Sequence, residues 1–115
     1  MDAPRILRKS DAFVLIEDGE FVRVYHDDSR LQFSTAELLP GARGPLDPGH
    51  ADADEVAYVM SGRITMRFPD HDLVLEGGAG DAIIIPAGVA HEPVNAGVEP
   101  AMLSWSLAPN RSPVT

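Results

Sequence analysis

Short β-prone segments separated by turns dominate this sequence, and they constrain its fold more than any other feature. The first two, residues 13–16 and 21–25, flank an Asp18-Gly19 pair. Such a pair favours a hairpin, because aspartate and glycine tolerate the positive φ of a tight turn. Further β-prone segments follow at 31–38, 55–60, 63–68, 72–76, 82–85 and 100–107. With glycine and proline in the turns and almost no helical periodicity, the pattern predicts an all-β sandwich or barrel.

The chain has the length of one domain. Its 115 residues can bury a core without disulfides, and the absence of cysteine excludes a thiolate metal site. We expect N-terminal strands within residues 1–37, a barrel core over 38–107 and a loose tail over 108–115. Within that core, the stretch 41–49 is rich in glycine, proline and aspartate and predicts a long loop.

The charge balance disfavours two classes of partner. Nine basic residues against eighteen acidic ones give a formal net charge of −9. Such a surface repels nucleic-acid phosphates and anionic lipids, so we expect neither nucleic-acid nor membrane binding. No long apolar run follows the basic residues near the N-terminus, and no segment has membrane-spanning length. We therefore expect no signal peptide and a cytoplasmic protein.

The histidines are the main candidates for chemistry. His26 and His71 fall in expected turns, where a solvated side chain is the simplest interpretation. His50 ends the long loop, and His91 follows a turn after a hydrophobic strand; ligand-binding groups collect at such loop ends. Glu55 begins an otherwise apolar strand, and a metal would offset the cost of burying its carboxylate. Spacing alone leaves open whether these three side chains meet.

One motif is specific. Gly80, Pro86, Gly88, His91 and Asn95 stand at the spacing G(x)5PxG(x)2H(x)3N. In this the chain resembles the cupin superfamily, whose second motif has that form. We interpret Asn95 as a residue that holds a loop by hydrogen bonds.

The other cupin motif, G(x)5HxH(x)3–4E(x)6G, is matched in part. His50, Glu55 and Gly62 have the required spacing when four residues separate the histidine from the glutamate. In this alignment Pro48 occupies the position of the family's first histidine. The resemblance covers residues 38–107 and implies a double-stranded β-helix, or jelly-roll β-barrel.

The resemblance also implies a metal site. Cupins bind one divalent transition metal, commonly Fe, Mn, Zn, Ni or Cu, through three histidines and the glutamate. Carried over to this chain, the ligands are His50, Glu55 and His91. Two histidines and one carboxylate suit non-haem iron and catalytic zinc.

Two features of the metal site stay open at this stage. Asp47 or Asp52 can substitute for the missing ligand, although aspartates in such loops more often form turns. An alternative alignment with three residues before Glu55 leaves only Glu55 and His91 in ligand positions. It favours a barrel that binds ligands without a metal.

Two functions of different kinds follow from the resemblance. The first is a small metal-dependent enzyme acting on a small oxygen-bearing molecule by oxygenase, isomerase, lyase or cyclase chemistry, with His50 or Glu55 as proton acceptor. The alternative is a non-catalytic barrel that binds a small polar metabolite or sugar. Met66 and Trp105 are expected in the pocket wall. The edge strands of residues 12–25 need covering, and small cupins generally dimerise, so we expect a homodimer.

Overall fold

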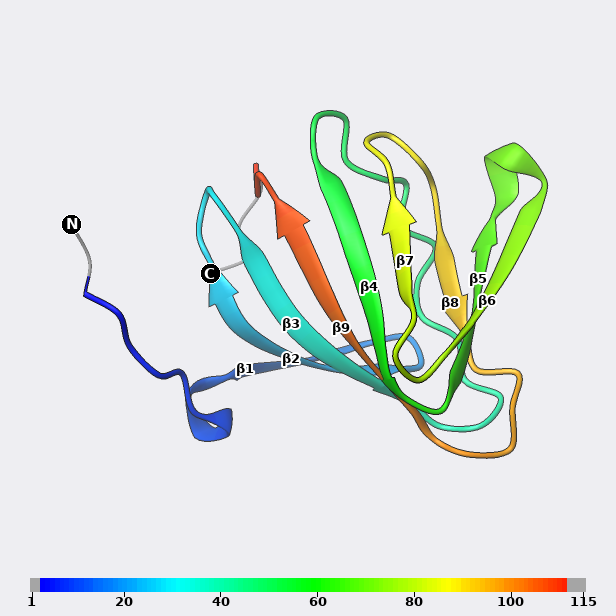
Figure 1. Cartoon of the computed structure of the whole chain (residues 1–115), viewed down its shortest axis with the longest axis horizontal. Helices are drawn as coiled ribbons and strands as arrows, with labels where there is room; N and C mark the ends of the chain where they lie inside the picture. Colours follow the sequence, from blue (N-terminus) through cyan, green and yellow to red (C-terminus); the bar gives the residue numbers. More distant parts are fainter. Residues whose placement is uncertain (1–2, 112–115) are drawn as a thin grey trace.

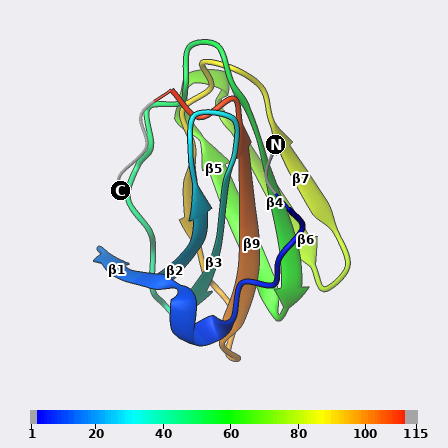
Figure 2. The same cartoon turned by 90° about the vertical axis from the view of Figure 1, so that its left-hand side faces the viewer.

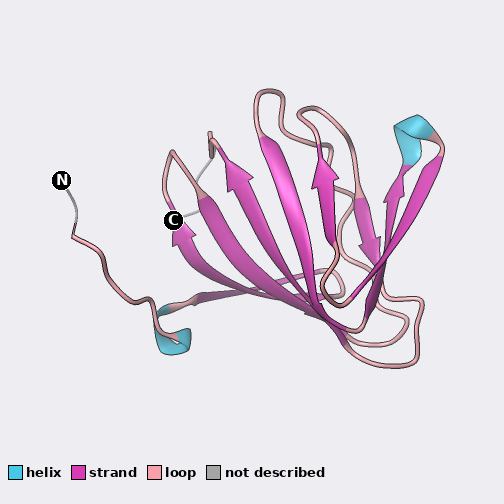
Figure 3. Cartoon of the chain, in the orientation of Figure 1, coloured by secondary structure: helices cyan, strands magenta, loops and turns pink. Residues whose placement is uncertain are grey.

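The structure, a computed structural model, describes residues 3–111 and confirms the predicted all-β jelly-roll fold (Figure 1). Strands make up most of the described chain, with two short helical turns beside them (Figure 3). In chain order the elements are η1 Lys9–Asp11, β1 Phe13–Glu17, β2 Glu20–Asp27, β3 Gln32–Leu38, β4 Asp54–Ser61, β5 Arg63–Phe68, η2 Pro69–His71, β6 Leu73–Gly78, β7 Ala82–Ile85, β8 Glu92–Val94 and β9 Ala101–Ala108.

The strands form two antiparallel sheets. The larger sheet has the order β1-β2-β3-β9-β4-β7, and the smaller has the order β6-β5-β8. The two sheets make the walls of the barrel (Figures 1 and 2). In this order β1 is an edge strand. The homodimer expected from the sequence stays a prediction.

The predicted hairpin at Asp18-Gly19 is present. Glu17 of β1 pairs with Glu20 of β2, and Asp18 adopts a φ of 51°. The amide of Gly19 donates to the carbonyl oxygen of Arg43 at 2.8 Å. A Cβ on Gly19 would lie 2.5 Å from that oxygen, so only glycine fits there. The hairpin is thereby fastened to the long loop between β3 and β4.

The core lies between the sheets and follows from alternation along the strands. In β9, Ala101, Leu103, Trp105 and Leu107 are buried, while the residues between them are partly exposed. Because successive side chains of a strand point to opposite faces, one face of β9 supplies the core. Met66 of β5 is fully buried in the same cluster.

Two local expectations are wrong, and one strand was not predicted. His26 belongs to β2, after a register shift between Val24 and His26, and is not in a turn. The short strand β8 was not among the predicted segments, because it has only three residues and contains Pro93; its Pro93 pairs with Met66. Asn110 is buried within the expected loose tail, because its amide groups donate to the carbonyl of Ser29 and to Asp27.

Residues 112–115 of that expected tail lie outside the described residues, as does the start of the N-terminal segment. His71 lies exposed in η2, as its turn context predicts. In the described part of the chain, no helix has the length and apolar character needed to cross a membrane.

Candidate metal centre

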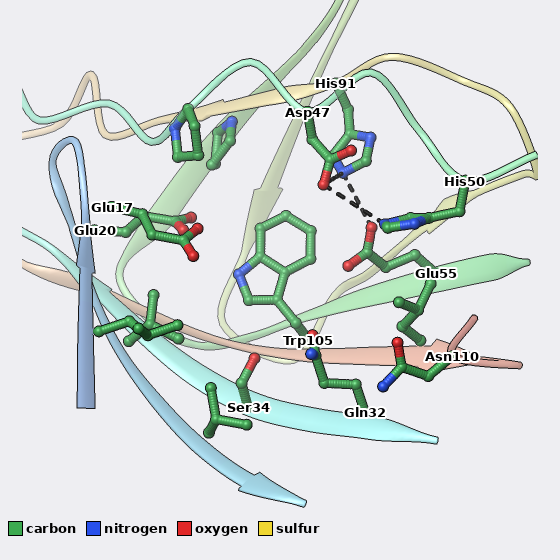
Figure 4. Close-up of a pocket in the computed structure, with 16 residues that line it drawn as sticks. Glu17, Glu20, Gln32, Ser34, Asp47, His50, Glu55, His91, Trp105 and Asn110 are labelled. Atoms are coloured by element: carbon green, nitrogen blue, oxygen red, sulfur yellow. Dashed lines mark ion pairs between the residues drawn. The ribbon is translucent and has the colours of Figure 1, made fainter. Parts of the chain in front are cut away.

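A cavity of about 190 Å³ opens inside the barrel (Figure 4). It lies against the first strands, the long loop and the residues around β8. Its lining combines carboxyl groups, imidazoles and one indole, from Glu17, Glu20, Asp47, His50, Glu55, His91 and Trp105. Among the described residues that line it, none is lysine or arginine. The cavity therefore has an acidic lining that attracts cations.

Glu55 is held inside the barrel by its central strand. It pairs with Ile85 of β7 on one side and with Leu107 of β9 on the other. Alternation along β4 turns Glu55 to the same side as Ala57 and Val59, and all three are buried. Its carboxyl group is thus fixed by a rigid element at the cavity.

Backbone hydrogen bonds join the segments that carry the two histidines. The amides of Asp47 and His91 each donate to the other residue's carbonyl oxygen at 2.9 Å. The amide of Gly88 donates to the carbonyl oxygen of His50 at 2.7 Å. Gly49 and Gly88 both have positive φ, and a Cβ on Gly49 would meet the backbone of residues 88–89. These hydrogen bonds and close contacts therefore join the regions of the two cupin motifs at this edge of the barrel.

The three predicted ligands all line the cavity, and Asp47 lies near both histidines. Nε2 of His91 lies 3.0 Å from Oε1 of Glu55. Nε2 of His50 lies 3.7 Å from Oδ2 of Asp47, and the same oxygen lies 3.8 Å from Nε2 of His91 (Figure 4). Ligand atoms of Asp47, His50 and Glu55 all lie within 4.8 Å of one another.

Three of these separations suit ligands of one metal ion. Ligand atoms bound about 2.1 Å from a shared metal lie roughly 3–4 Å apart, and the His91–Glu55, His50–Asp47 and His91–Asp47 separations of 3.0, 3.7 and 3.8 Å fall in that range. His91 is not part of the set of Asp47, His50 and Glu55 whose ligand atoms all lie within 4.8 Å of one another. Nδ1 of His91 lies 2.9 Å from the carbonyl oxygen of Val89, so the hydrogen bond places the proton on Nδ1. Nε2, which faces Glu55 and Asp47, is then available as a ligand.

Asp47 is absent from the ligand set that the family resemblance implies, which is His50, Glu55 and His91. Sequence reasoning named it only as a substitute, together with Asp52. Oδ1 of Asp47 accepts from the amide of Gly49 at 2.8 Å, the expected turn role, while Oδ2 faces the histidines. Asp52 instead pairs with Arg111 at the exposed surface. The sequence feature that could have identified Asp47 as a ligand is its position directly before Pro48, which replaces the first histidine of the family motif.

The electrostatics of the cluster favour a cation. Burial lowers the pKa of His91, but hydrogen bonds with Glu55 and the Val89 carbonyl, and the charges of Glu55 and Asp47, raise it above its usual value overall. The two carboxylates therefore favour the protonated form of this imidazole. A divalent cation would replace that proton between the same groups.

The two predicted wall residues have different positions. Trp105 lines the cavity, and its ring centroid lies 5.8 Å from that of His91. Met66 is absent from the lining and packs in the core, because β5 turns this side chain into the apolar layer between the sheets. Asn95 holds a loop as interpreted, donating to the carbonyls of Leu38 and Glu99.

Glu20 also lines the cavity, and sequence reasoning did not single it out. Its signal was the alternation of β2, where Glu20, Val22 and Val24 share the buried face. Burial, followed by the charges of Glu17, Glu55 and Asp47, raises the pKa of Glu20 to about 7, against a smaller lowering by His91.

The comparisons with known proteins agree with this architecture. Residues 34–107 match the cupin domain family. KdgF from Halomonas sp. is 16% identical with a TM-score of 0.78, over 96% of this chain and 97% of that one. An RmlC-like cupin from Shewanella frigidimarina is 19% identical with a TM-score of 0.77, over 96% and 95%. The polyketide cyclase RemF from Streptomyces resistomycificus is 22% identical with a TM-score of 0.73, over 98% and 83%.

At these identities the likeness to solved structures shows the fold alone. No curated protein matches the chain significantly. The family match spans more than half of the chain and includes both motif regions. This protein therefore belongs to the cupin family.

Proposed function

We propose that this cupin is a metal-dependent enzyme that acts on a small oxygen-bearing organic molecule. The observation that carries the proposal is the convergence of His50, Glu55, His91 and Asp47 at one cavity. Glu55 and His91 are buried in this cluster, and a buried carboxylate is costly without a cation or another partner. The carboxylate of Asp47 takes the place of the histidine that Pro48 removes from the family motif.

These four residues would hold one divalent transition metal. Imidazole and carboxylate ligands suit Fe, Mn, Zn, Ni and Cu(II), and the absence of cysteine removes the softest ligand type. When bound, the metal supplies Lewis acidity toward a substrate oxygen or a place for dioxygen, the chemistry of oxygenase-, isomerase-, lyase- or cyclase-type cupins.

The chain's own residues have distinct parts in this function. His91 is almost fully buried, and its Nδ1 hydrogen bond fixes the direction of Nε2. Glu55, also buried, is oriented by the central strand β4. The His50 side chain is 37% exposed, so it lies on the side of the cluster open to solvent. His50 or Glu55 would accept a proton from a substrate bound in the cavity when it leaves the metal.

Metal analysis of the purified, untagged protein tests the proposal. We expect about one equivalent of Fe, Mn, Zn, Ni or Cu after supplementation, measured by elemental analysis. The His50→Ala and His91→Ala variants should lose it, because each removes a ligand. His71→Ala is the matched control, since His71 is exposed in η2 and should leave the metal content unchanged.

A second matched pair tests the added ligand. Asp47→Asn should weaken metal binding about tenfold or more, measured by titration calorimetry, by comparison with the loss that a disturbed outer-shell partner causes. Asp52→Asn, in the same loop but paired with Arg111, should not. A wild-type protein that binds none of the five metals would overturn the enzyme in this form and favour the metal-free binder.

A further inference from the structure

Glu20 is a buried carboxyl group that the metal centre does not use. It begins β2, is 5% exposed and lines the cavity. Its Oε1 has no hydrogen-bond partner in the structure. Figure 4 shows Glu20 beside Glu17, with the indole of Trp105 between these two carboxyl groups and the ion-paired cluster. The cavity therefore has a second polar end.

The position of Glu20 is built into the fold. A Cβ on Gly44 would lie 2.8 Å from Cδ and 2.9 Å from Oε1 of Glu20, and 2.8 Å from Cγ of Pro93. The long loop thus uses a glycine to make room for this carboxyl group. The hydrogen bond from Gly19 to Arg43 holds the hairpin against the same stretch of loop.

No basic side chain neutralises this end of the cavity among the residues that line it in the described structure. The guanidinium of Arg43 lies 4.0 Å from Oε1 of Glu92, and Arg67 pairs with the same oxygen. A buried polar atom without a partner is unfavourable in the free protein. A ligand group that offers a hydrogen-bond donor would relieve that cost.

The charge of the cavity narrows the ligand further. The lining holds four carboxyl groups, those of Glu17, Glu20, Asp47 and Glu55. When these groups are ionised, one divalent cation at the metal centre offsets two of their four negative charges, so the cavity keeps a net negative charge. A dianionic substrate would be repelled, whereas an uncharged molecule with hydroxyl groups would not.

We propose that Glu20, supported by Glu17, forms a second subsite that binds a hydroxyl group of an uncharged substrate whose other end reaches the metal centre. The substrate class is thus a small neutral hydroxylated compound that offers an oxygen atom to the metal. This inference rests on the proposed function for the metal end only. Trp105, between the two ends, provides an apolar surface for the carbon chain.

Binding measurements on the metal-loaded protein test the subsite. The probes are erythrulose and xylulose, which are neutral hydroxyketones, their analogues without the terminal hydroxyl, and malonate as a dianion. In the wild type we expect each hydroxyketone to bind about tenfold or more tightly than its deoxy analogue, because a polar site rejects a ligand that leaves it unpaired. Malonate should bind more weakly than either hydroxyketone.

Variants assign that preference to Glu20. Glu20→Leu should remove the difference between each hydroxyketone and its deoxy analogue, while Glu20→Gln, which keeps a hydrogen-bonding group, should retain part of it. Glu99→Gln is the control, because Glu99 is exposed outside the cavity lining. An unchanged preference in Glu20→Leu, tighter binding of malonate, or no binding of any neutral probe would each overturn the proposal.

The metal content of the protein distinguishes failure of the Glu20 subsite from failure of the proposed enzyme. If the wild type and Glu20→Gln both bind metal but show no hydroxyl preference, the subsite fails and the metal centre stands. If the wild type binds no metal, the proposed enzyme fails, and the same probe series on the metal-free protein still decides whether Glu20 binds hydroxyl groups.

Discussion

At the scale of single residues, the protonation of Glu20 makes the stability of the folded protein depend on pH. In the folded protein its pKa is raised to about 7 from the ordinary value of 4.5, chiefly by burial and then by Glu17, with Glu55 and Asp47 adding and His91 opposing. The folded state therefore keeps a proton that the unfolded chain releases. This contribution to stability is present below about pH 4.5 and is lost as the pH rises to about 7.

We predict that the metal-free wild type loses stability between about pH 4.5 and pH 7, by at most about 3 kcal/mol from this group. Urea unfolding in the presence of a chelator measures it. Glu20→Gln, which has no proton to lose, should show a shallower decline. The raised pKa of His91 acts in the same direction and is common to both proteins, so the difference between the profiles reports Glu20. Parallel profiles would contradict the prediction.

Some residues of the site could be identified from the sequence, and others could not. The motif spacing pointed to His50, Glu55 and His91, since a repeated family pattern records which positions face the metal. The direction of Asp47 depends on its backbone bridge to His91, which is distant in sequence. Glu20 is buried among apolar neighbours on β2, and an acidic residue at a strand end reads as a turn residue until the packing is known.

At the scale of elements, the β1–β2 hairpin positions Glu17 and Glu20, and its contact with the long loop depends on Gly19. We predict that Gly19→Ala lowers the free energy of unfolding by about 1–3 kcal/mol, because the added Cβ would press on the backbone of Arg43. Thermal or urea unfolding measures the loss. Gly97→Ala is the control, since its nearest neighbour would be a side-chain oxygen at 3.4 Å. Equal stability of the two variants would contradict the hairpin's dependence on this contact.

Most elements were predictable from the sequence, and the exceptions have physical causes. The alternating segments became strands, and the Asp18-Gly19 turn formed, because local pattern and tertiary packing agree there. The strand β8 has three residues and contains proline, so only its pairing with β5 defines it. Asn110 is ordered by partners that are distant in sequence, Asp27 at the end of β2 and Ser29 just after it, which no local pattern indicates.

At the scale of the whole molecule, both ends of the cavity are assembled from distant parts of the chain. The hairpin brings Glu20, the long loop brings Asp47 and His50, and the segment before β8 brings His91. A chain that has unfolded no longer holds these groups together. Metal binding is therefore linked to folding of the entire barrel, and the metal stabilises the folded state by mass action.

This linkage gives the last prediction. At a free metal concentration of 100 times the dissociation constant, the metal that binds should stabilise the fold by about 2.7 kcal/mol. For a domain of this size, that raises the melting temperature by roughly 10 °C. Scanning calorimetry with and without metal measures the shift, and a chelator should reverse it. At the same metal concentration Asp47→Asn should show a smaller shift and Asp52→Asn the full one. A melting temperature independent of metal in the wild type would mean that the cluster of carboxylates and imidazoles is stable without a cation.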